Sequence, residues 1–377
     1  SARRHFFRKY GQLMYEVFYK LKAEPFRLSP DHHFCYNHKC YAKARAYMAY
    51  AFMRAEGFVM ITGRPGTGKT TLIGELVENL ADEKVKTANL VCTQLKADDL
   101  LKVTAYSFGI DHSIVEKGEL LQQLGMLLRR WHRDGHRALL IVDEAQDLSE
   151  SAMEELRLLT NIQEGGKPLL QIFLLGQPEL RDLILSPSME QVHQRVVAAS
   201  HLEALKNEET EAYILHRLEK VGWQADPALS KSLFPLIHKF SEGVPRRINL
   251  ICSRLFLHGC VEQRHRIGVA DLQEVIDELQ RENLAAGTEF TEDDFKIDDD
   301  YGPQDTAETS GDSPLSYESA EDSGNRQPTS DYTMAENPET GDVAQQKYPH
   351  AVGEDVVIPF DGAKSGSIPD NEKKKMT

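Results

Sequence analysis

The sequence predicts an α/β domain built on a mainly parallel sheet, followed by an all-helical domain and an acidic tail. Between residues 15 and 287, short apolar runs alternate with helical patterns, which is typical of parallel strands covered by helices. After residue 205 the strand-like runs stop and only helical patterns follow. From about residue 288 the composition turns to Asp, Glu, Ser, Thr, Gly and Pro. These three observations set the order of the parts.

Five apolar runs are the candidate strands of one sheet, at residues 57–62, 85–91, 138–143, 169–176 and 196–205. Helices are predicted between them because apolar residues recur three and four positions apart, at residues 70–80, 97–108, 118–131 and 151–161. The second domain is predicted to hold helices near residues 208–221, 229–240, 245–260 and 269–282. The expected parts are an α/β domain over 14–205 and a helical domain over 206–287.

The two ends of the chain are expected to be disordered. Residues 288–377 hold 22 acidic and 7 basic residues, which accounts for the whole net charge of −15. Such a segment has too little apolar surface to offset the entropy of ordering. Residues 1–13 are interpreted as a short disordered extension. Because the remaining chain is neutral overall, a basic nucleic-acid groove across the whole domain is not expected.

The cysteine pattern and the hydropathy predict a cytoplasmic protein. Five cysteines spread over a long chain without paired spacing are typical of reduced thiols. No stretch approaches 18 consecutive apolar residues, and the basic, aromatic N-terminus lacks the apolar centre of a signal peptide. Neither a transmembrane segment nor export is predicted.

Residues 63–70, GRPGTGKT, match the phosphate-loop pattern G-x-x-x-x-G-K-[ST], with a strand before them and a helix after them. Glycines let backbone N–H groups converge on phosphate oxygens, and the helix presents its positive end. Lys69 is expected to reach the terminal phosphates of ATP, and Thr70 to hold Mg²⁺. The predicted nucleotide-binding residues are Gly63, Arg64, Pro65, Gly66, Thr67, Gly68, Lys69, Thr70 and Thr71.

The second motif is an acidic pair that follows the apolar run at residues 138–142. Asp143 is expected to bind the metal through water, and Glu144 to polarise an attacking water. Gln177 follows another apolar run, expected to lie between the two motif strands, so its side chain is a candidate contact for the γ-phosphate and the water. The other interpretation of Gln177 is turn punctuation around Pro178.

Several further motifs accompany the phosphate loop, and together they are specific. They are MYEVFYKLKAEPFRLSPD, ANLVCTQLKADDLL, LLIVDEAQDL, LLGQPELRDLILSP, QRVVAASHLEAL and EGVPRRINLICSRLFL. Over residues 14–282 the chain resembles AAA+ ATPases of the general secretion pathway protein A type, and most closely those associated with exosortase (PEP-CTERM) systems. The resemblance implies a five-stranded P-loop sheet with a C-terminal helical lid.

The resemblance also implies roles for three polar residues. Gln177 corresponds to the sensor on the fourth strand. Arg195 corresponds to a finger that reaches a neighbouring subunit's nucleotide, with Arg181 as the competing candidate. Arg246 corresponds to the sensor of the lid, preferred to Arg247.

The chain departs from its relatives at a few positions. Asp147 stands where Asn commonly follows DEAQ, and Arg64 where an acid often follows the first loop glycine. Some relatives continue into a membrane span and a peptidoglycan-binding module, whereas this chain continues into an acidic tail. Direct engagement of the cell wall is therefore not expected.

Two aromatic segments and one cluster of metal-ligand residue types need an interpretation. The segment HHFCYNHKC at residues 32–40 lacks the second ligand pair of a zinc module. Residues 25–36 are expected instead to fold over the adenine, with Phe26, Phe34 or Tyr36 lining it. The run Tyr41, Tyr47, Tyr50, Phe52 is expected to be the buried face of a helix rather than a base-stacking strip.

The sequence thus predicts a cytoplasmic ATPase that binds ATP and Mg²⁺ between an α/β domain and a lid. The resemblance implies a nucleotide-dependent homo-oligomer that acts on a secretion or exopolysaccharide assembly, placed peripherally at the inner membrane by its partners. The main alternative is a DNA-transaction ATPase of the transposition type. A polysaccharide-system tyrosine kinase fits less well, because strand 85–91 ends in Val91-Cys92-Thr93 rather than in a second acidic motif.

Overall fold

The computed structural model describes residues 14–29, 31–55, 57–80, 84–91, 96–282 and 292–301. The chain divides into two compact units, residues 1–307 and residues 308–377, and every described residue belongs to the first. The predicted extension at residues 1–13 and the tail beyond residue 301 lie outside the described residues.

A five-stranded parallel sheet forms the centre of the α/β domain, as predicted. Its strands are β1 (Phe58–Gly63), β2 (Val85–Val91), β3 (Arg137–Asp143), β6 (Leu170–Gly176) and β7 (Val196–Leu202), arranged in the order β2-β3-β6-β1-β7. All neighbouring pairs run parallel. Strand β6 therefore lies between β1, which precedes the phosphate loop, and β3, which leads into the acidic pair Asp143 and Glu144. The last predicted strand is shorter than expected and ends at Leu202.

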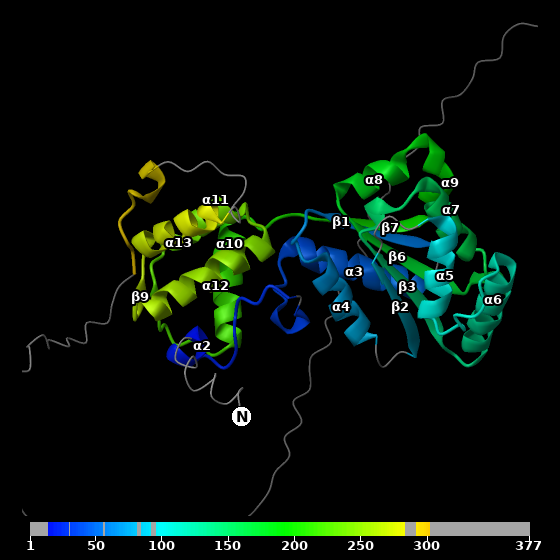
Figure 1. The fold of residues 1–377 in the computed structure, drawn as a ribbon, viewed down its shortest axis with the longest axis horizontal. Helices are drawn as coiled ribbons and strands as arrows, with labels where there is room; N and C mark the ends of the chain where they lie inside the picture. Colours follow the sequence, from blue (N-terminus) through cyan, green and yellow to red (C-terminus); the bar gives the residue numbers. More distant parts are fainter. Residues whose placement is uncertain are drawn as a thin grey trace, which may run out of the picture. The chain divides into compact units, whose positions relative to one another are not determined.

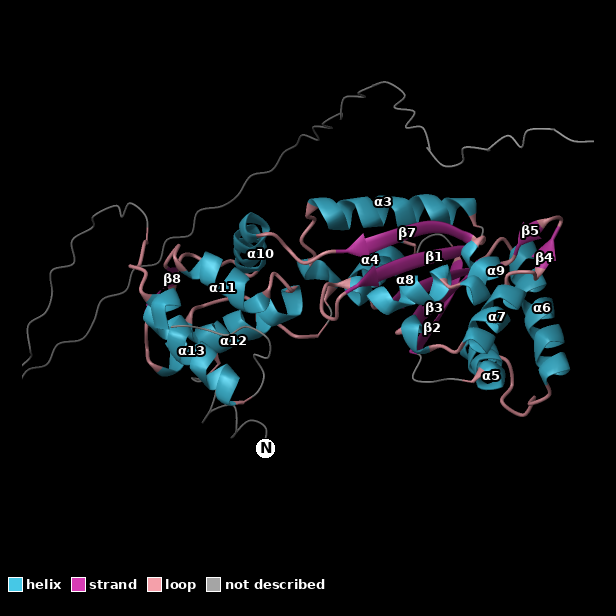
Figure 2. Cartoon of the chain, turned by 90° about the horizontal axis from the view of Figure 1, so that it is seen from above, coloured by secondary structure: helices cyan, strands magenta, loops and turns pink. Residues whose placement is uncertain are grey.

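Helices cover both faces of this sheet (Figures 1 and 2). One face carries α3 (Lys39–Arg54) and α4 (Lys69–Asn79), and Figure 2 shows α3 lying along β7. The other face carries α5 (Ala97–Ser107), α6 (Lys117–Arg133), α7 (Glu150–Leu159), α8 (Pro178–Leu185) and α9 (Glu190–His193). Short elements connect them: η2 (His32–Phe34), η3 (Ala145–Asp147), the β4–β5 hairpin (Gln163–Glu164 with Lys167–Pro168) and η4 (Pro187–Met189).

The three central strands β1, β3 and β6 are almost entirely apolar because both of their faces are buried, whereas the outer strands β2 and β7 also carry exposed polar residues. In β1, Val59 and Ile61 join the core beneath α3 and α4, whereas Phe58 and Met60 join the core on the opposite face. Successive residues of a strand point to opposite faces, so a strand covered on both sides is apolar at nearly every position. Gln171 of β6 is an exception, and its Nε2 donates to the Ala51 carbonyl at 2.9 Å. This burial fixes the register and holds the strand ends that carry the site.

The helical domain contains α10 (Asn207–Lys220), α11 (Leu233–Ser241), α12 (Pro245–Val261) and α13 (Val269–Arg281). The prediction that this domain is all-helical and that its second helix begins at residue 229 is wrong. Residues Ala228–Leu229 form β8, which pairs with β9 (Arg266–Ile267). The Ser230 N–H donates to the Ile267 carbonyl at 3.1 Å, and this tertiary pairing keeps the backbone extended until Leu233.

The segment before the sheet packs on the helical domain. Helix α2 (Tyr15–Phe18), Tyr19 and Phe26 belong to the apolar core formed by α10 to α13. The Tyr15, Tyr19 and Phe26 rings lie 5.8, 5.6 and 5.4 Å from the Phe256 ring. The chain thus begins against the lid core before it enters the α/β domain, so the first residues assigned by sequence to the α/β domain add to the core of the other.

The beginning of the acidic tail is ordered, which corrects the expectation of disorder from residue 288. Residues 292–301 include η5 (Glu292–Phe295), and the Phe295 ring stacks on Phe240 at 5.4 Å. The Asp299 carboxylate accepts the Val269 N–H at 2.9 Å, at the positive end of α13. Buried aromatic surface and a helix-end carboxylate outweigh the polar composition here. No helix among the described residues is long and apolar enough to cross a bilayer.

Candidate nucleotide-binding site

The phosphate loop joins β1 to α4 with the predicted strand–loop–helix geometry. Gly66 and Gly68 have φ values of +84° and +98°, a left-handed conformation that glycine adopts without strain. The loop therefore turns tightly enough to place the first N–H groups of α4 at the end of the sheet. Such a helix end is a ready binding site for phosphate.

Lys69 begins α4, and its side chain is 7% exposed. Its ammonium donates to the carbonyl oxygens of Gly63 at 2.8 Å and Arg64 at 3.3 Å. Burial lowers the pKa of Lys69, while the Glu144 and Asp143 carboxylates act in the opposite direction. The loop thus holds the Lys69 ammonium close to the backbone N–H groups of the loop. The terminal phosphates of a nucleotide would lie beside these groups.

Thr70 and Asp143 meet at this edge of the sheet. The Thr70 hydroxyl donates to Asp143 Oδ2 at 3.1 Å, which links α4 to the end of β3. Mg²⁺ prefers oxygen ligands and commonly uses one carboxylate together with phosphate oxygens and water. A hydroxyl and a carboxylate in contact beside a phosphate loop fit that ion.

Glu144 directly follows β3 and has an unusual backbone. Its φ and ψ are 54° and 40°, in the left-handed region that non-glycine residues seldom occupy. The Glu144 N–H donates to Asp143 Oδ1 at 3.0 Å, which helps to hold this turn. Backbone strain of this kind concentrates at functional sites. Glu144 lines a cavity together with the phosphate loop.

Gln146 is a site residue that the sequence reasoning missed. Its Nε2 donates to Glu144 Oε2 at 2.9 Å, and its Oε1 accepts the backbone N–H of Gln177 at 2.9 Å. The signal in the sequence was the Q of DEAQ. It carried no meaning without the fold, because its second partner lies 31 residues farther along the chain.

Gln177 follows β6 and precedes α8, at the position between β1 and β3 that the sequence predicted. It is half-buried, and its backbone N–H is the group that bonds Gln146. The contact of its side chain with a γ-phosphate stays a prediction.

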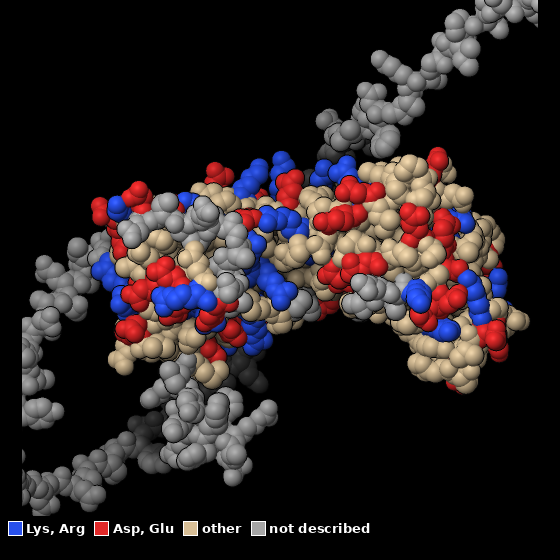
Figure 3. Space-filling view, turned by 45° about the horizontal axis from the view of Figure 1, so that its top comes forward, with Lys and Arg blue, Asp and Glu red and all other residues tan. Residues whose placement is uncertain are grey.

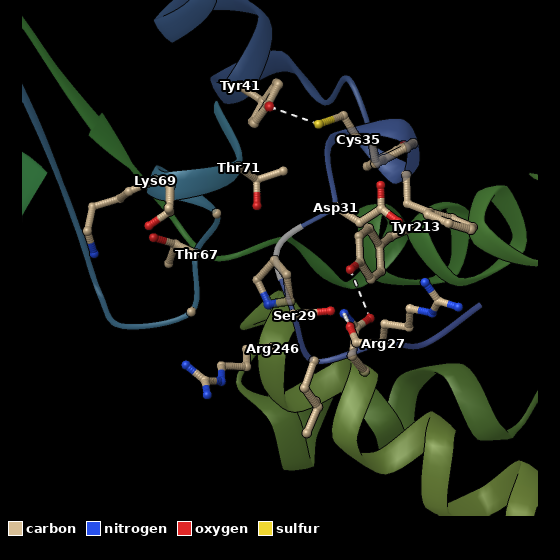
Figure 4. Close-up of a pocket in the computed structure, with 18 of the residues that line it drawn as sticks. Arg27, Ser29, Asp31, Cys35, Tyr41, Thr67, Lys69, Thr71, Tyr213 and Arg246 are labelled. Carbon is tan, nitrogen blue, oxygen red and sulfur yellow. Dashed lines mark hydrogen bonds between the residues drawn. The ribbon is translucent and has the colours of Figure 1, made fainter. Parts of the chain in front are cut away.

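A cavity of ≈ 460 Å³ opens beside the loop (Figure 4). Four parts of the chain line it: the loop itself, the N-terminal segment from Arg27 to Tyr41, the acidic pair Asp143 and Glu144, and residues of the helical domain. Figure 4 shows Lys69 and Thr67 on one side and Tyr213 on the other. Phe34 and Tyr36 line the cavity, and their contact with adenine stays a prediction. Phe26 does not line the cavity, because it is fully buried in the lid core.

Arg217 holds the N-terminal segment against the lid and was not foreseen. This side chain is 6% exposed. Its Nε donates to the Pro25 carbonyl at 2.6 Å, and its guanidinium lies 4.8 Å from the Phe34 ring centre. Asn249 adds a bond from Nδ2 to the Arg27 carbonyl at 3.1 Å. These contacts fix the wall of the cavity that would face the base.

The segment with several metal-ligand residue types is used for packing. Cys35 Sγ lies 3.0 Å from the Tyr41 hydroxyl, which donates to Glu75 Oε2 at 3.0 Å. Cys40 donates to the His201 carbonyl at 3.2 Å. Burial raises the pKa of Cys35. Within the described ranges, no group of three His, Cys, Asp or Glu side chains is arranged to hold a metal ion.

The aromatic run on α3 is only partly buried. Tyr41 and Phe52 are 5% and 2% exposed, as predicted, whereas Tyr47 and Tyr50 are 47% and 59% exposed. The prediction is wrong for the latter two because α3 shows one face to the sheet and the other to solvent. The exposed face carries the two tyrosines beside Lys43 and Arg54.

The beginning of α12 contacts the phosphate loop. The Arg246 N–H donates to the Gly66 carbonyl at 3.2 Å, and Arg246 lines the cavity. Arg247 instead binds Glu242 at 3.0 Å. Arg64 also binds Glu242, at 2.5 Å, and this bond lowers the pKa of the Glu242 carboxyl.

The Arg64–Glu242 pair is a weak link between the loop and the lid. The two side chains are 48% and 31% exposed, and pairs this exposed contribute about 0–1 kcal/mol. The backbone bond to Gly66 and the packing around the loop therefore carry more of the contact. Of the two candidate sensors, the geometry favours Arg246, which stays a prediction.

Arg195 lies at the opposite edge of the sheet. It immediately precedes β7, and its Nη1 donates to the Thr160 hydroxyl at 2.7 Å. Because β7 runs parallel to β1, a full strand separates Arg195 from the loop edge, about 20 Å at 3.3 Å per residue. No arginine side chain spans that distance. Arg181, on α8, is exposed near the loop edge.

Residues 53–184 match the AAA domain family. The chain is 34% identical to general secretion pathway protein A of Aeromonas hydrophila over 263 residues, 69% of this chain and 47% of that protein. It is 29% identical to the Mu-like prophage FluMu DNA transposition protein B of Haemophilus influenzae over 157 residues, 40% of this chain and 50% of that protein. The chain spans about half the length of these relatives.

Two solved structures share the fold. Cdc6p from Pyrobaculum aerophilum has a TM-score of 0.56 at 16% identity, over 71% of this chain and 73% of that one. The ORC1 protein of Aeropyrum pernix, solved in complex with DNA, has a TM-score of 0.54 at 14% identity, over 70% and 71%. The chain therefore has the P-loop fold of AAA+ proteins and an AAA domain match over residues 53–184, and it is similar to general secretion pathway protein A over 69% of its length.

Proposed function

We propose that this chain is a Mg²⁺-dependent ATPase that works as a homo-oligomer. One observation carries the proposal: the Thr70–Asp143 hydrogen bond brings the phosphate-loop helix and the end of β3 together, with Glu144 next in the chain. This arrangement supplies a phosphate-binding turn, oxygen ligands and a carboxylate base at one edge of the sheet. Hydrolysis of a phosphoanhydride needs these three parts.

Each residue of the edge has a distinct task. The loop N–H groups and Lys69 bind the phosphates and stabilise the charge that develops on them. Thr70 and Asp143 would hold Mg²⁺, which when bound would neutralise phosphate charge. Glu144 accepts a proton from the attacking water, a role that contributes about 10²–10⁴-fold in rate. Gln177 contacts the γ-phosphate and the attacking water. Phe34 and Tyr36 contact the adenine base.

The site is completed by a second copy of the chain. Arg195 is too far from its own loop, yet it lies on a sheet edge that a neighbouring subunit can meet. An arginine supplied across an interface is worth about 10³–10⁵ in rate in related P-loop systems. Arg246, on the lid, then senses the same nucleotide from within the chain.

The direct test uses the purified full chain. Phosphate release from ATP is measured with Mg²⁺ and again with excess EDTA, and nucleotide affinity is measured with a fluorescent ATP analogue. Magnesium-dependent release that is lost with EDTA is the expected result. Tight binding of the analogue without any phosphate release would reduce the protein to a nucleotide-binding switch.

We further propose that the ATPase serves a secretion or exopolysaccharide assembly of the exosortase (PEP-CTERM) type. The similarity to general secretion pathway protein A supports a secretion role, and the chain would act from the cytoplasm, held at the inner membrane by its partners. Deleting the gene in its native host and assaying surface polysaccharide and secreted proteins tests this. Unchanged export of both would contradict the assignment.

The second candidate is a DNA-transaction ATPase, favoured by the similarity to the prophage transposition protein. On the face drawn in Figure 3, basic and acidic side chains are interspersed over the described residues. A nonspecific DNA-binding surface is ordinarily more basic. Stimulation of ATPase activity by duplex DNA at low salt, lost at high salt, would favour this candidate over the secretion role.

A further inference from the structure

Gln146 lies between two parts of the site that the proposed function uses separately. It belongs to the short helix η3, directly after Glu144 and Ala145. One end of its side-chain amide contacts the Glu144 carboxylate, and the other end contacts the backbone where β6 passes into α8. The amide therefore bridges the base and the sensor segment.

The chemistry of its two partners fixes the orientation of this amide. A backbone N–H only donates, so the Gln146 atom that faces Gln177 must be the carbonyl oxygen. The NH₂ group then faces Glu144 Oε2, which as a carboxylate oxygen only accepts. Turning the amide over would place donor against donor at one end and acceptor against acceptor at the other. The NH₂ group of Gln146 thus donates a hydrogen bond to the proposed base, Glu144.

The surrounding chain makes room for this bridge. A Cβ atom on Gly176 would lie 2.8 Å from Gln146 Oε1, so glycine at the end of β6 allows the amide to approach the backbone. The left-handed conformation of Glu144 turns its carboxylate back toward the same amide. Two independent backbone features therefore favour one position of the Gln146 side chain.

We infer that Gln146 is a positioning residue that holds Glu144 in its reactive orientation and couples it to the Gln177 segment. The inference rests on the proposed ATPase function. The bond engages Glu144 Oε2, and no described residue donates a hydrogen bond to Oε1, which is left to accept the proton of the attacking water. A nucleotide that moves the Gln177 segment shifts the N–H donor to which the Gln146 carbonyl is bonded, and with it the base.

The test replaces the amide without changing the volume of the side chain. Gln146→Met removes both hydrogen bonds, and we expect kcat to fall about tenfold, below the 10²–10⁴-fold that a general base contributes. KM for ATP and the affinity for a non-hydrolysable analogue should stay within about twofold, since Gln146 does not itself line the cavity. Gln171→Met is the matched control, because Gln171 is a buried β6 glutamine bonded to the Ala51 carbonyl.

A double variant separates positioning from folding. In the Glu144→Gln background, Gln146→Met should add less than about twofold, because the residue acts through Glu144. Gln146→Glu retains an acceptor for the Gln177 N–H but offers no amide donor to Glu144. It should show the same loss of kcat even if the methionine variant folds poorly.

Each result decides the matter. A Gln146→Met or Gln146→Glu enzyme with kcat within twofold of the unmodified chain would overturn the inference while leaving the ATPase assignment intact. An equal additional loss in the Glu144→Gln background would also overturn it, because Gln146 would then act independently of the base. An unmodified chain that binds ATP but releases no phosphate overturns both proposals together.

Discussion

The two ends of the parallel strands in the central sheet differ in the residues that they carry. The carboxyl ends are called the near edge, and the amino ends are called the far edge. At the carboxyl ends of the strands, the phosphate loop, Asp143, Glu144 and Gln146 contact one another within a single chain. At the opposite edge, the Arg195 side chain donates to the Thr160 hydroxyl of its own domain. In the proposed function, the near edge binds the nucleotide within one chain, and the far edge supplies Arg195 to the site of a neighbouring subunit.

The largest expected effect on ATP hydrolysis comes from removing the Arg195 side chain at the far edge. Arg195→Ala should reduce ATP hydrolysis about 10³–10⁵-fold while nucleotide affinity stays nearly unchanged, because the guanidinium acts on transition-state charge in another subunit. Activity per subunit of the unmodified chain should rise with protein concentration. Arg181→Ala tests the competing candidate for the finger and should leave hydrolysis nearly unchanged if Arg195 has this role.

Mixing two inactive variants isolates this effect. Glu144→Gln subunits retain Arg195, and Arg195→Ala subunits retain Glu144, so the mixture should recover part of the lost activity. Absence of recovery, together with a rate independent of concentration, would show that Arg195 does not act between subunits.

The second prediction breaks the chemistry of the near edge without its binding. Glu144→Gln should lower kcat about 10²–10⁴-fold and retain ATP affinity, since Asp143 and the loop are intact. Phosphate release and analogue binding measure the two parts. A parallel loss of both would show that Glu144, with its left-handed backbone, is structural.

The third prediction concerns binding at the near edge. Lys69→Ala removes the ammonium that is held at the Gly63 and Arg64 carbonyls, and should weaken ATP affinity at least tenfold. Titration with a fluorescent analogue checks this. Unchanged affinity would mean that the loop does not bind the terminal phosphates.

The smallest expected effect sharpens the boundary of the folded unit. Deleting residues 302–377 should leave the melting temperature unchanged. Deleting residues 288–377 should lower it by several degrees, since about 1 kcal/mol corresponds to about 2–4 °C for a domain of this size. The lost contacts include the Phe295–Phe240 stack and the Asp299 bond at α13.

A single substitution tests the same point within the full chain. Phe295→Ala should reproduce part of the loss in differential scanning calorimetry. If both truncations melt at the same temperature, the segment at residues 292–301 adds nothing to stability.

The sequence alone determined the fold class and the near edge of the site. Strands buried on both faces read as apolar runs, and the α/β helices end within two residues of their predicted bounds, because helical periodicity is a local signal. The phosphate loop and the acidic pair were equally visible. The residues within each motif are adjacent in the chain, and the parallel strands β1 and β3 bring the two motifs to the same end of the sheet.

Only the tertiary structure decided the rest. Gln146, Arg217 and Phe26 acquire their positions from partners distant in the sequence, and no local pattern encodes such contacts. The same holds for the pairing of β8 with β9 and for residues 292–301, where composition predicted disorder and helix-end and aromatic contacts produced order. Long-range packing decides these positions because its free energy depends on which surfaces meet, and that information is spread over the whole chain.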